Sequence, residues 1–174
     1  MSIDQFNIIL SILALFGQIS IIVLILYLFF GQKYQPRLVK AIINNLIPLA
    51  FIVALVATSG SLYYSEIAKF TPCELCWFQR IFIYPQVILL GLAWLKKEQH
   101  ILDYSLVMIV VGIIISLYHN YIYFTAKPSG FCSIVAPCTQ QYIVGFNYIT
   151  IPLLALTSLV LIGLLLLSKK IIKT

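Results

Sequence analysis

Five long apolar runs constrain this chain more than any other feature. They cover about Ile8–Phe30, Ile42–Tyr64, Trp77–Leu95, Ile101–Phe124 and Tyr148–Leu167. Each approaches the roughly 20 residues that a helix needs to cross about 30 Å of hydrocarbon, and helices satisfy their own backbone there. Only 9% of the residues are charged, against about 25% in a typical soluble domain. The sequence therefore predicts an all-α polytopic membrane protein.

The first run stands apart from the other four. We predict one membrane domain over residues 1–174, made of an extra N-terminal transmembrane helix at about 1–34 and a four-helix transmembrane bundle at 42–168. The first run has no basic segment before it, its apolar stretch is long, and no small-residue cleavage site follows. These features favour a retained helix over a cleaved signal peptide.

Positively charged residues gather in alternate loops. The loops after the first and third runs, and the segment after the fifth, hold Lys33, Arg37, Lys40, Lys96, Lys97, Lys169, Lys170 and Lys173. The opposite loops hold only Lys69 and Lys127 among clear loop residues. The positive-inside rule predicts a cytoplasmic C-terminus and an external N-terminus. A role in nucleic-acid binding explains the net charge of +6 less well, because the charges lie in short loops between apolar runs.

A CxxC motif, Cys73 and Cys76, lies at the predicted outer end of the third run. Thr71 suits an N-cap, Pro72 suits the first helical position, and Glu74 has the spacing of a capping box. Cysteines three residues apart share one face of a helix. A helix N-terminus favours thiolate over thiol. The motif therefore predicts a redox-capable thiol pair at the start of a helix.

A second pair, Cys132 and Cys138, lies in the predicted outer loop at 125–147. All four cysteines then face the oxidising side of the membrane. Two pairs on one side allow disulfide exchange between them, which one pair does not. Two other interpretations stay open from the residues alone: structural disulfides, or a zinc site to which both pairs contribute ligands.

Arg80 and His119 are predicted at similar depths near the outer side, about four and five residues inside their helices at about 1.5 Å per residue. Arg80 has two possible roles. Its side chain either extends to the outer membrane–water interface, or it belongs to a functional site, as a hydrogen-bond donor to a bound redox cofactor or as a cation near the Cys76 thiolate. His119 is either a satisfied interfacial residue or a second donor or proton relay. Together they would line any polar site there.

These residues resemble a known family. The run from Tyr64 to Pro85, with Cys73-Glu-Leu-Cys76-Trp-Phe-Gln-Arg80 inside it, closely resembles the DsbB/BdbC disulfide-bond-formation membrane proteins. The resemblance covers about residues 45–168. Further matching features are Tyr118-His119, the loop pair Cys132 and Cys138, and Ile151-Pro152.

The resemblance implies a four-helix bundle in the bacterial cytoplasmic membrane, embedded in lipid. It implies re-oxidation of an extracytoplasmic thioredoxin-fold (DsbA-like) thiol oxidase, with two electrons passed to membrane quinone, either ubiquinone or menaquinone. This activity would support disulfide bond formation in exported proteins, and it requires no metal. The first helix departs from the family pattern, which starts on the inner side.

The resemblance also implies roles for individual residues. Cys73–Cys76 would be the quinone-coupled pair, with Cys76 the thiolate nearest the quinone, and Cys132–Cys138 would be the partner-facing pair. Arg80 matches the family's quinone-site arginine, and His119 resembles its helix-borne histidine. Two alternatives are a vitamin-K-epoxide-reductase-like quinone reductase and a non-catalytic membrane protein with structural or zinc-binding cysteines.

Overall fold

The computed structural model describes residues 3–31, 42–98, 100–125, 132, 138, 143–145 and 148–173. Its elements, in chain order, are α1 (Ile3–Leu26), η1 (Tyr27–Gly31), α3 (Leu46–Leu62), η2 (Tyr63–Ile67), α4 (Glu74–Lys96), α5 (His100–Thr125), β1 (Ile143–Gly145), β2 (Ile149–Thr150) and α6 (Ile151–Lys173). The segments η1 and η2 are π-helical. Within these described residues, five helices are long and apolar enough to cross a membrane, so the predicted all-α polytopic class is confirmed.

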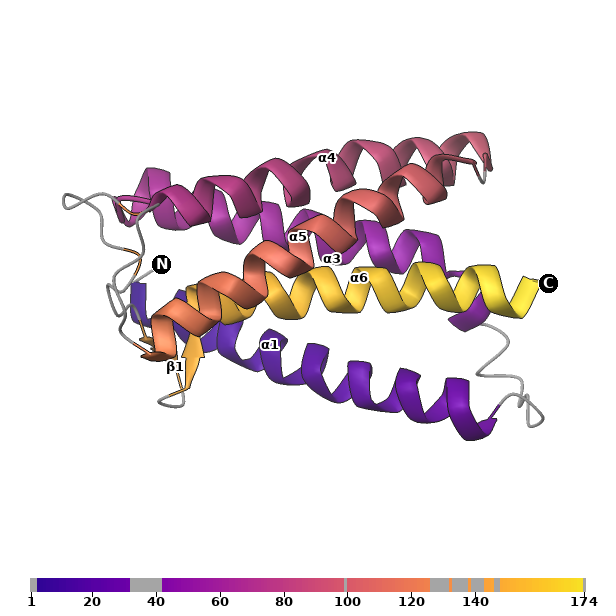
Figure 1. Cartoon of the computed structure of the whole chain (residues 1–174), viewed down its shortest axis with the longest axis horizontal. Coiled ribbons are helices and arrows are strands. Elements are labelled where there is room, and N and C mark those ends of the chain that lie inside the picture. Colours follow the sequence, from indigo (N-terminus) through magenta and orange to yellow (C-terminus); the bar gives the residue numbers. More distant parts are fainter. Residues whose placement is uncertain are drawn as a thin grey trace.

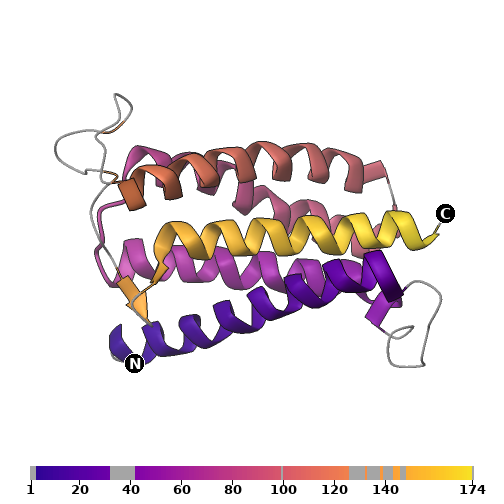
Figure 2. The ribbon, with the colours of Figure 1, turned by 60° about the horizontal axis from the view of Figure 1, so that its bottom comes forward.

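Four of these helices, α3 to α6, pack against one another, and α1 packs against α6. In two views α1 lies along one side of the bundle, away from α5 (Figures 1 and 2). The N-terminal end of α1 and the C-terminal end of α6 lie at opposite ends of the molecule (Figure 1). The extra helix is therefore an outer element that contacts the bundle mainly through α6.

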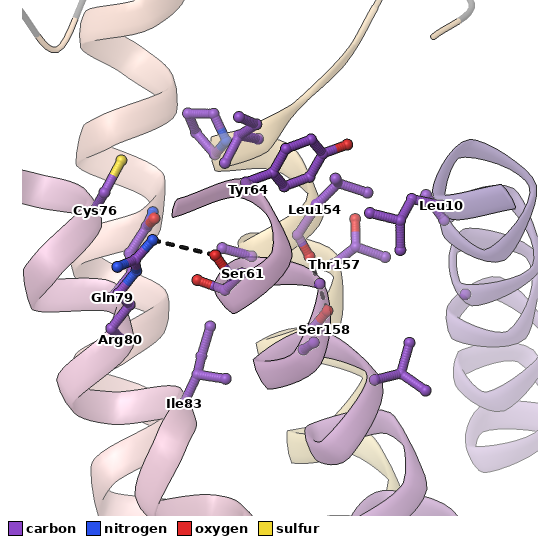
Figure 3. A pocket seen from close by; sticks show the side chains of 18 of the residues that line it. Leu10, Ser61, Tyr64, Cys76, Gln79, Arg80, Ile83, Leu154, Thr157 and Ser158 are labelled. Carbon is purple, nitrogen blue, oxygen red and sulfur yellow. Dashed lines mark hydrogen bonds between the residues drawn. The ribbon is translucent and has the colours of Figure 1, made fainter. Parts of the chain in front are cut away.

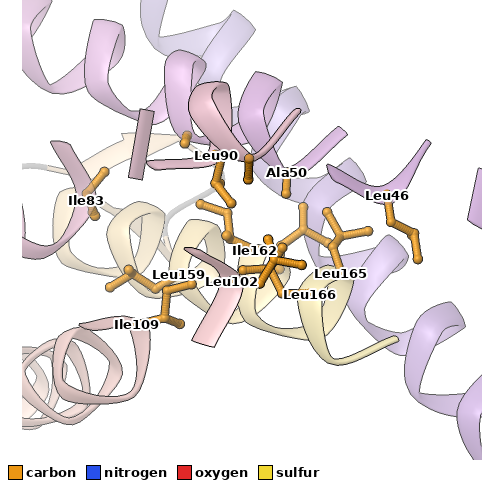
Figure 4. Close-up of a cluster of buried hydrophobic side chains, with 13 residues drawn as sticks. Leu46, Ala50, Ile83, Leu90, Leu102, Ile109, Leu159, Ile162, Leu165 and Leu166 are labelled. Atoms are coloured by element: carbon orange, nitrogen blue, oxygen red, sulfur yellow. The ribbon is translucent and has the colours of Figure 1, made fainter. Parts of the chain in front are cut away.

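Among the described residues, the cluster with the most buried apolar side chains extends toward the end of the bundle that is remote from the cysteines. Leu90, Leu159 and Ile162 are fully buried in one apolar cluster (Figure 4). Ala50 and Ala54 on α3 belong to the same cluster, and such small side chains allow helices to approach closely. Closer to the cysteines the helices leave room for the cavity described below.

The start of α4 differs from the prediction. The helix begins at Glu74 with Cys73 as its N-cap, so the predicted capping box at Thr71 and helical Pro72 are wrong. Cys73 has an extended backbone, with φ −72° and ψ 169°. Its side chain is buried, with 6% exposed, and packs beside Ile122 of α5. Tertiary burial of this cysteine outweighs the local capping preference of Thr71.

The segment before α6 contains a short β-hairpin that was not predicted from the sequence. Strand β1 pairs antiparallel with β2, and Ile143 faces Thr150. The hairpin lies against α1, and α6 begins at Ile151 rather than at Tyr148. It therefore connects the cysteine loop to both α1 and α6.

At the far end, α6 continues beyond the predicted Leu167. Lys170 there pairs with Asp103 at 2.8 Å. Lys96 and Lys97 lie at the same end, remote from the CxxC motif at the start of α4. Four predicted loop charges lie outside the described residues: Lys33, Arg37, Lys40 and Lys127.

Candidate redox site

The structure brings the two cysteine pairs together. Cys73 and Cys138 are buried in one cluster, and Cys76 and Cys132 pack against it. Cys132 and Cys138 form a disulfide, with their Cα atoms 5.8 Å apart. Cys73 and Cys76 are free thiols, and their sulfur atoms lie 3.1 Å apart. One pair is thus oxidised and the other reduced, within a shared apolar setting.

The positions of Cys73 and Cys76 at the start of α4 explain why their sulfur atoms lie close together. Cys73 caps α4 in an extended conformation, and Cys76 lies in the first turn of that helix. The Cys73 backbone oxygen accepts a hydrogen bond from the Trp77 N–H at 3.2 Å, which closes this turn. The two sulfur atoms therefore face each other at the helix end, where partial positive charge stabilises a thiolate.

His119 on α5 completes this arrangement. Its Nε2 lies 3.7 Å from the Cys73 sulfur, and its ring is almost fully buried. The hydrogen bond from the Cys76 thiol, followed by that from His119, lowers the pKa of the Cys73 thiol to about 4, although burial opposes the shift. A free cysteine has a pKa of about 8.5. These contacts therefore favour the thiolate form of Cys73 over the thiol.

Arg80 lies one turn below Cys76 and is turned toward α3. Its Nη2 donates to the Ser61 backbone oxygen at 3.3 Å (Figure 3). Its guanidinium also lies 5.1 Å from the centre of the Trp77 ring, within cation–π range. The guanidinium is half-buried and held between α3 and α4. Ser61 lies two residues before the π-helical segment η2, and π-helical turns are frequent at functional sites.

A cavity of about 360 Å³ opens beside these residues. Cys73, Cys76, Arg80, His119 and Cys138 all line it, so it joins five of the six predicted site residues. The sixth, Cys132, is joined to it through the disulfide. The volume falls in the range of about 300–1,000 Å³ that is typical of small-molecule sites.

Among the other polar residues that line the cavity, two that were not predicted as site residues carry a buried polar group without a partner among the described residues. Gln79 is 3% exposed, and its Nε2 has no hydrogen-bond partner among the described residues. The Tyr123 hydroxyl on α5 is also buried without a partner there. Such groups cost free energy unless something pairs with them. A polar ligand in the cavity would pair with them, and Gln79 could have been suspected from its place between Cys76 and Arg80.

The predicted alternative of a four-cysteine metal site does not match this geometry, because Cys132 and Cys138 are bonded to each other. A smaller set remains: one ligand atom each from Cys73, Cys76 and His119 lies within 4.8 Å of the others. Thiolate and imidazole are ligands that zinc accepts. The reduced pair and the histidine therefore have the composition of a three-ligand metal site.

Comparison with known proteins gives the family. The family model described as "Disulfide bond formation protein DsbB" matches residues 44–167 of this chain. The chain belongs to the DsbB family. It is 47% identical over 118 residues to disulfide bond formation protein C of Bacillus subtilis (strain 168), which covers 65% of this chain and 83% of that protein. It is 43% identical over 123 residues to a probable disulfide formation protein C of Halalkalibacterium halodurans, covering 69% and 89%.

No solved structure matches the chain. The DsbB match begins at residue 44 and ends at 167, so it spans α3 to α6 and leaves α1 outside. This member of the DsbB family is therefore a multi-pass membrane disulfide oxidoreductase whose first helix lies outside the matched region.

Proposed function

We propose that this protein re-oxidises an extracytoplasmic thioredoxin-fold thiol oxidase and passes the two electrons to a membrane quinone. The packing of both cysteine pairs in one buried cluster carries the proposal. Membership of the DsbB family supports a thiol–disulfide partner. The result would be continued disulfide formation in exported proteins.

The chemistry follows from two disulfide exchanges. A thiolate of the reduced partner attacks the Cys132–Cys138 disulfide, and the second partner thiolate resolves the mixed disulfide. The partner leaves oxidised, and the loop pair becomes a dithiol. The loop dithiol then reduces a Cys73–Cys76 disulfide by the same exchange, which restores the loop disulfide. The described arrangement, with an oxidised loop pair and reduced Cys73 and Cys76, corresponds to the end of this step.

The cavity beside Cys76 fits a quinone headgroup. A bound quinone supplies an acceptor for two electrons and two protons. Arg80 and Gln79 offer donors on one wall, and the Tyr123 hydroxyl offers another. Ring carbonyl oxygens accept such hydrogen bonds. His119 holds the thiolate of Cys73 through its Nε2.

We also propose that the cysteine-bearing end faces outward across the bacterial cytoplasmic membrane. The N-terminus would then be outside and the C-terminus cytoplasmic. Lys96, Lys97, Lys169 and Lys170 lie at the opposite end of the helices, and the positive-inside rule supports a cytoplasmic location for that end. A membrane-impermeant thiol reagent should label Cys132 or Cys138 in intact, reduced cells. Labelling only after membrane rupture would reverse the orientation.

The central test counts thiols in purified, reduced protein before and after quinone is added anaerobically. We expect free thiols to disappear with stoichiometric formation of quinol. A Cys76→Ser variant should form no quinol, because it has no Cys73–Cys76 disulfide to make. Retention of all thiols in the presence of quinone would refute the proposal.

Zinc binding is the second candidate, because Cys73, Cys76 and His119 have ligand atoms close together. Metal analysis of the same preparation distinguishes a quinone-dependent oxidoreductase from a zinc-binding protein. Stoichiometric zinc that is lost in a His119→Ala variant, combined with no reaction with quinone, would favour a metal-binding protein.

A further inference from the structure

The wall of the cavity opposite the cysteines comes from α1, the helix that the family match leaves out. Leu10, Ala14 and Gly17 of α1 line the cavity, together with α3 residues such as Val53 and Ala57. In Figure 3, Leu10 lies across the cavity from Cys76 and Arg80. The four matched helices alone would leave this side open. The added helix therefore changes the shape of the site next to the redox pair.

The lining changes character along the membrane normal. Three of its polar side chains, Cys76, Gln79 and Arg80, lie in the first two turns of α4. The hydroxyls of Ser20, Thr157 and Ser158 also belong to the lining, and each donates to a backbone oxygen of its own helix. The deepest α4 residue of the lining is Ile83, about 15 Å from Cys73 at about 1.5 Å per residue. Around this depth the cavity walls consist mainly of apolar side chains, of which Val53 on α3 is one. The cavity thus suits a molecule with a polar head at the cysteine end and an apolar tail toward the bilayer centre.

The apolar part opens sideways, between α1 and α3. These two helices make few contacts with each other. Phe16 on α1 and Ile52 on α3 line the cavity yet are 64% and 52% exposed on the protein surface. Leu13 and Val56 share this pattern. In a membrane-spanning helix these exposed faces meet lipid, so the opening leads to the hydrocarbon.

Close packing holds α1 in this position. A Cβ atom at Gly17 would lie 3.2 Å from the Thr157 methyl group of α6, so glycine allows the two helices to meet. The Tyr148 hydroxyl donates to Gln18 Oε1 at 3.0 Å. The helix is thus fixed on one side while its other side borders the cavity.

We propose that α1 and α3 form a lateral channel that holds the isoprenoid tail of the quinone, with the headgroup at Cys76 and Arg80. The inference rests on the proposed quinone reaction. Continuity between the apolar channel and the redox pair identifies the occupant, because a quinone joins a polar ring to a long apolar chain. A phospholipid acyl chain would share the apolar chemistry but has no reason to extend to the thiol pair.

The test uses three probes on the full-length protein in lipid nanodiscs: a long-tailed quinone with a photoreactive group in its tail, a phospholipid with the same group in an acyl chain, and a tail-less quinone as competitor. We expect the quinone probe to label peptides of α1 and α3. Unlabelled long-tailed quinone should abolish this labelling at a concentration about tenfold below that of the tail-less quinone, which corresponds to about 1.4 kcal/mol.

Two channel variants and two matched controls localise the tail. Ala14→Phe fills the cavity from α1, and Val56→Trp narrows the opening from the surface of α3, where the added ring does not disturb the core. Both should raise the concentration of quinone probe needed for half-maximal labelling about tenfold. Ile12→Phe and Leu55→Trp place the same aromatic side chains at exposed positions of α1 and α3 outside the lining, and they should leave labelling unchanged.

The outcomes distinguish this inference from the proposed function. Labelling of α1 by the phospholipid probe alone, without competition by quinone, would make the channel a lipid site and overturn the inference. Equal effects of channel and control variants would also overturn it. If the tail-less quinone oxidises the thiols of the wild-type protein while the quinone probe leaves α1 unlabelled, the quinone reaction stands and only the tail channel falls. If no quinone oxidises the wild-type thiols, the proposed function itself fails.

Discussion

The Tyr64 hydroxyl on η2 donates a hydrogen bond of 2.7 Å to Asn7 Oδ1 on α1. This bond joins the added helix to the segment that leads into the CxxC motif. Tyr64 is buried and stacks on Phe70, three residues before Cys73. Phe6 of α1 stacks on the neighbouring Tyr63, with ring centres 3.7 Å apart. The position of α1 and the position of the redox pair are therefore connected through one aromatic cluster.

The first prediction concerns this connection. Tyr64→Phe removes the hydrogen bond and leaves Asn7 Oδ1 without this donor, which should lower the free energy of unfolding by about 1 kcal/mol. Tyr63→Phe is the matched control, because it keeps the ring that stacks on Phe6. Thermal unfolding of both variants in detergent would compare them. Equal unfolding midpoints would show that the bond adds nothing to the docking of α1.

The second prediction concerns the thiolate of Cys73. In a reduced Cys132→Ser/Cys138→Ser variant Cys73 and Cys76 are the remaining cysteines, and ultraviolet absorbance of the thiolate should persist as the pH falls until it is lost near pH 4. Because the pKa in the folded state lies below the ordinary value of about 8.5, the thiolate stabilises the fold above that value and loses this effect as the pH falls through about 4.

Substitution of His119 tests whether this residue lowers the pKa of the Cys73 thiol. His119→Ala removes a hydrogen bond that lowers the pKa of Cys73, so the absorbance step should move to higher pH. A Cys73→Ser variant identifies the signal by removing the low-pH step. An unchanged step in His119→Ala would contradict the assigned contact between His119 Nε2 and the Cys73 sulfur.

The third prediction compares two buried glutamines on α4. Gln79 Nε2 has no partner among the described residues, whereas Gln86 accepts a hydrogen bond from Ser105 and donates to the Phe82 backbone oxygen. Gln79→Leu should therefore raise the unfolding midpoint in the absence of quinone, while raising the KM for quinone. Gln86→Leu leaves the Ser105 hydroxyl unpaired and should destabilise the fold by about 1–3 kcal/mol. A destabilised Gln79→Leu protein would show that the amide is already satisfied.

The fourth prediction concerns Arg80. Arg80→Ala should raise the KM for quinone about tenfold or more, since hydrogen bonds of charged groups contribute about 1.5–3 kcal/mol. Exchange of the loop disulfide with a reduced partner should continue, because the Arg80 side chain contacts the Ser61 backbone oxygen and the Trp77 ring rather than a loop cysteine. Lys96→Ala, which removes a positive charge at the far end of α4, is the control. An unchanged KM would mean that Arg80 serves only to join α4 to Ser61.

Much of the architecture followed from elementary features of the sequence. Apolar runs of about 20 residues predicted five membrane helices, because no other backbone arrangement in this chain satisfies itself in hydrocarbon. The start of α4 was misplaced, since burial of Cys73 is a tertiary effect that Thr71 and Pro72 do not report. The short β1–β2 hairpin also escaped, because its pairing depends on packing against α1.

The candidate site was predictable only in part. The motif identified Cys73, Cys76 and Arg80, and the similar depths of Arg80 and His119 placed the histidine near them. The contact of His119 with Cys73 rather than with Arg80 depends on how α5 packs against the start of α4, which is a tertiary relationship that the sequence does not specify. The wall formed by α1 had no sequence signal, because Leu10, Ala14 and Gly17 resemble any other residues of a membrane helix.

The last prediction tests the order of the loop cysteines. Cys138 is 3% exposed and buried beside Cys73, whereas Cys132 is only partly buried. Cys132 is therefore the sulfur that a docking protein reaches more easily, and Cys138 is better placed to relay electrons to the CxxC pair. A mixed disulfide persists when the thiolate that would resolve it is missing. In Cys138→Ser the free Cys132 thiolate can attack the disulfide of the oxidised partner and release one partner thiolate. Because the second loop thiolate is then missing, a covalent complex between Cys132 and the oxidised partner should accumulate on non-reducing gels.

The matched variant Cys132→Ser should form no such complex, because the remaining Cys138 sulfur is shielded from the partner. An adduct in Cys132→Ser but not in Cys138→Ser would reverse the order within the pair. If neither variant trapped a partner and both kept full thiol-oxidising activity, the Cys132–Cys138 disulfide would be structural. The buried cluster of four cysteines would then hold the loop against α4 and α5, and electrons would have to enter at Cys73 and Cys76 directly.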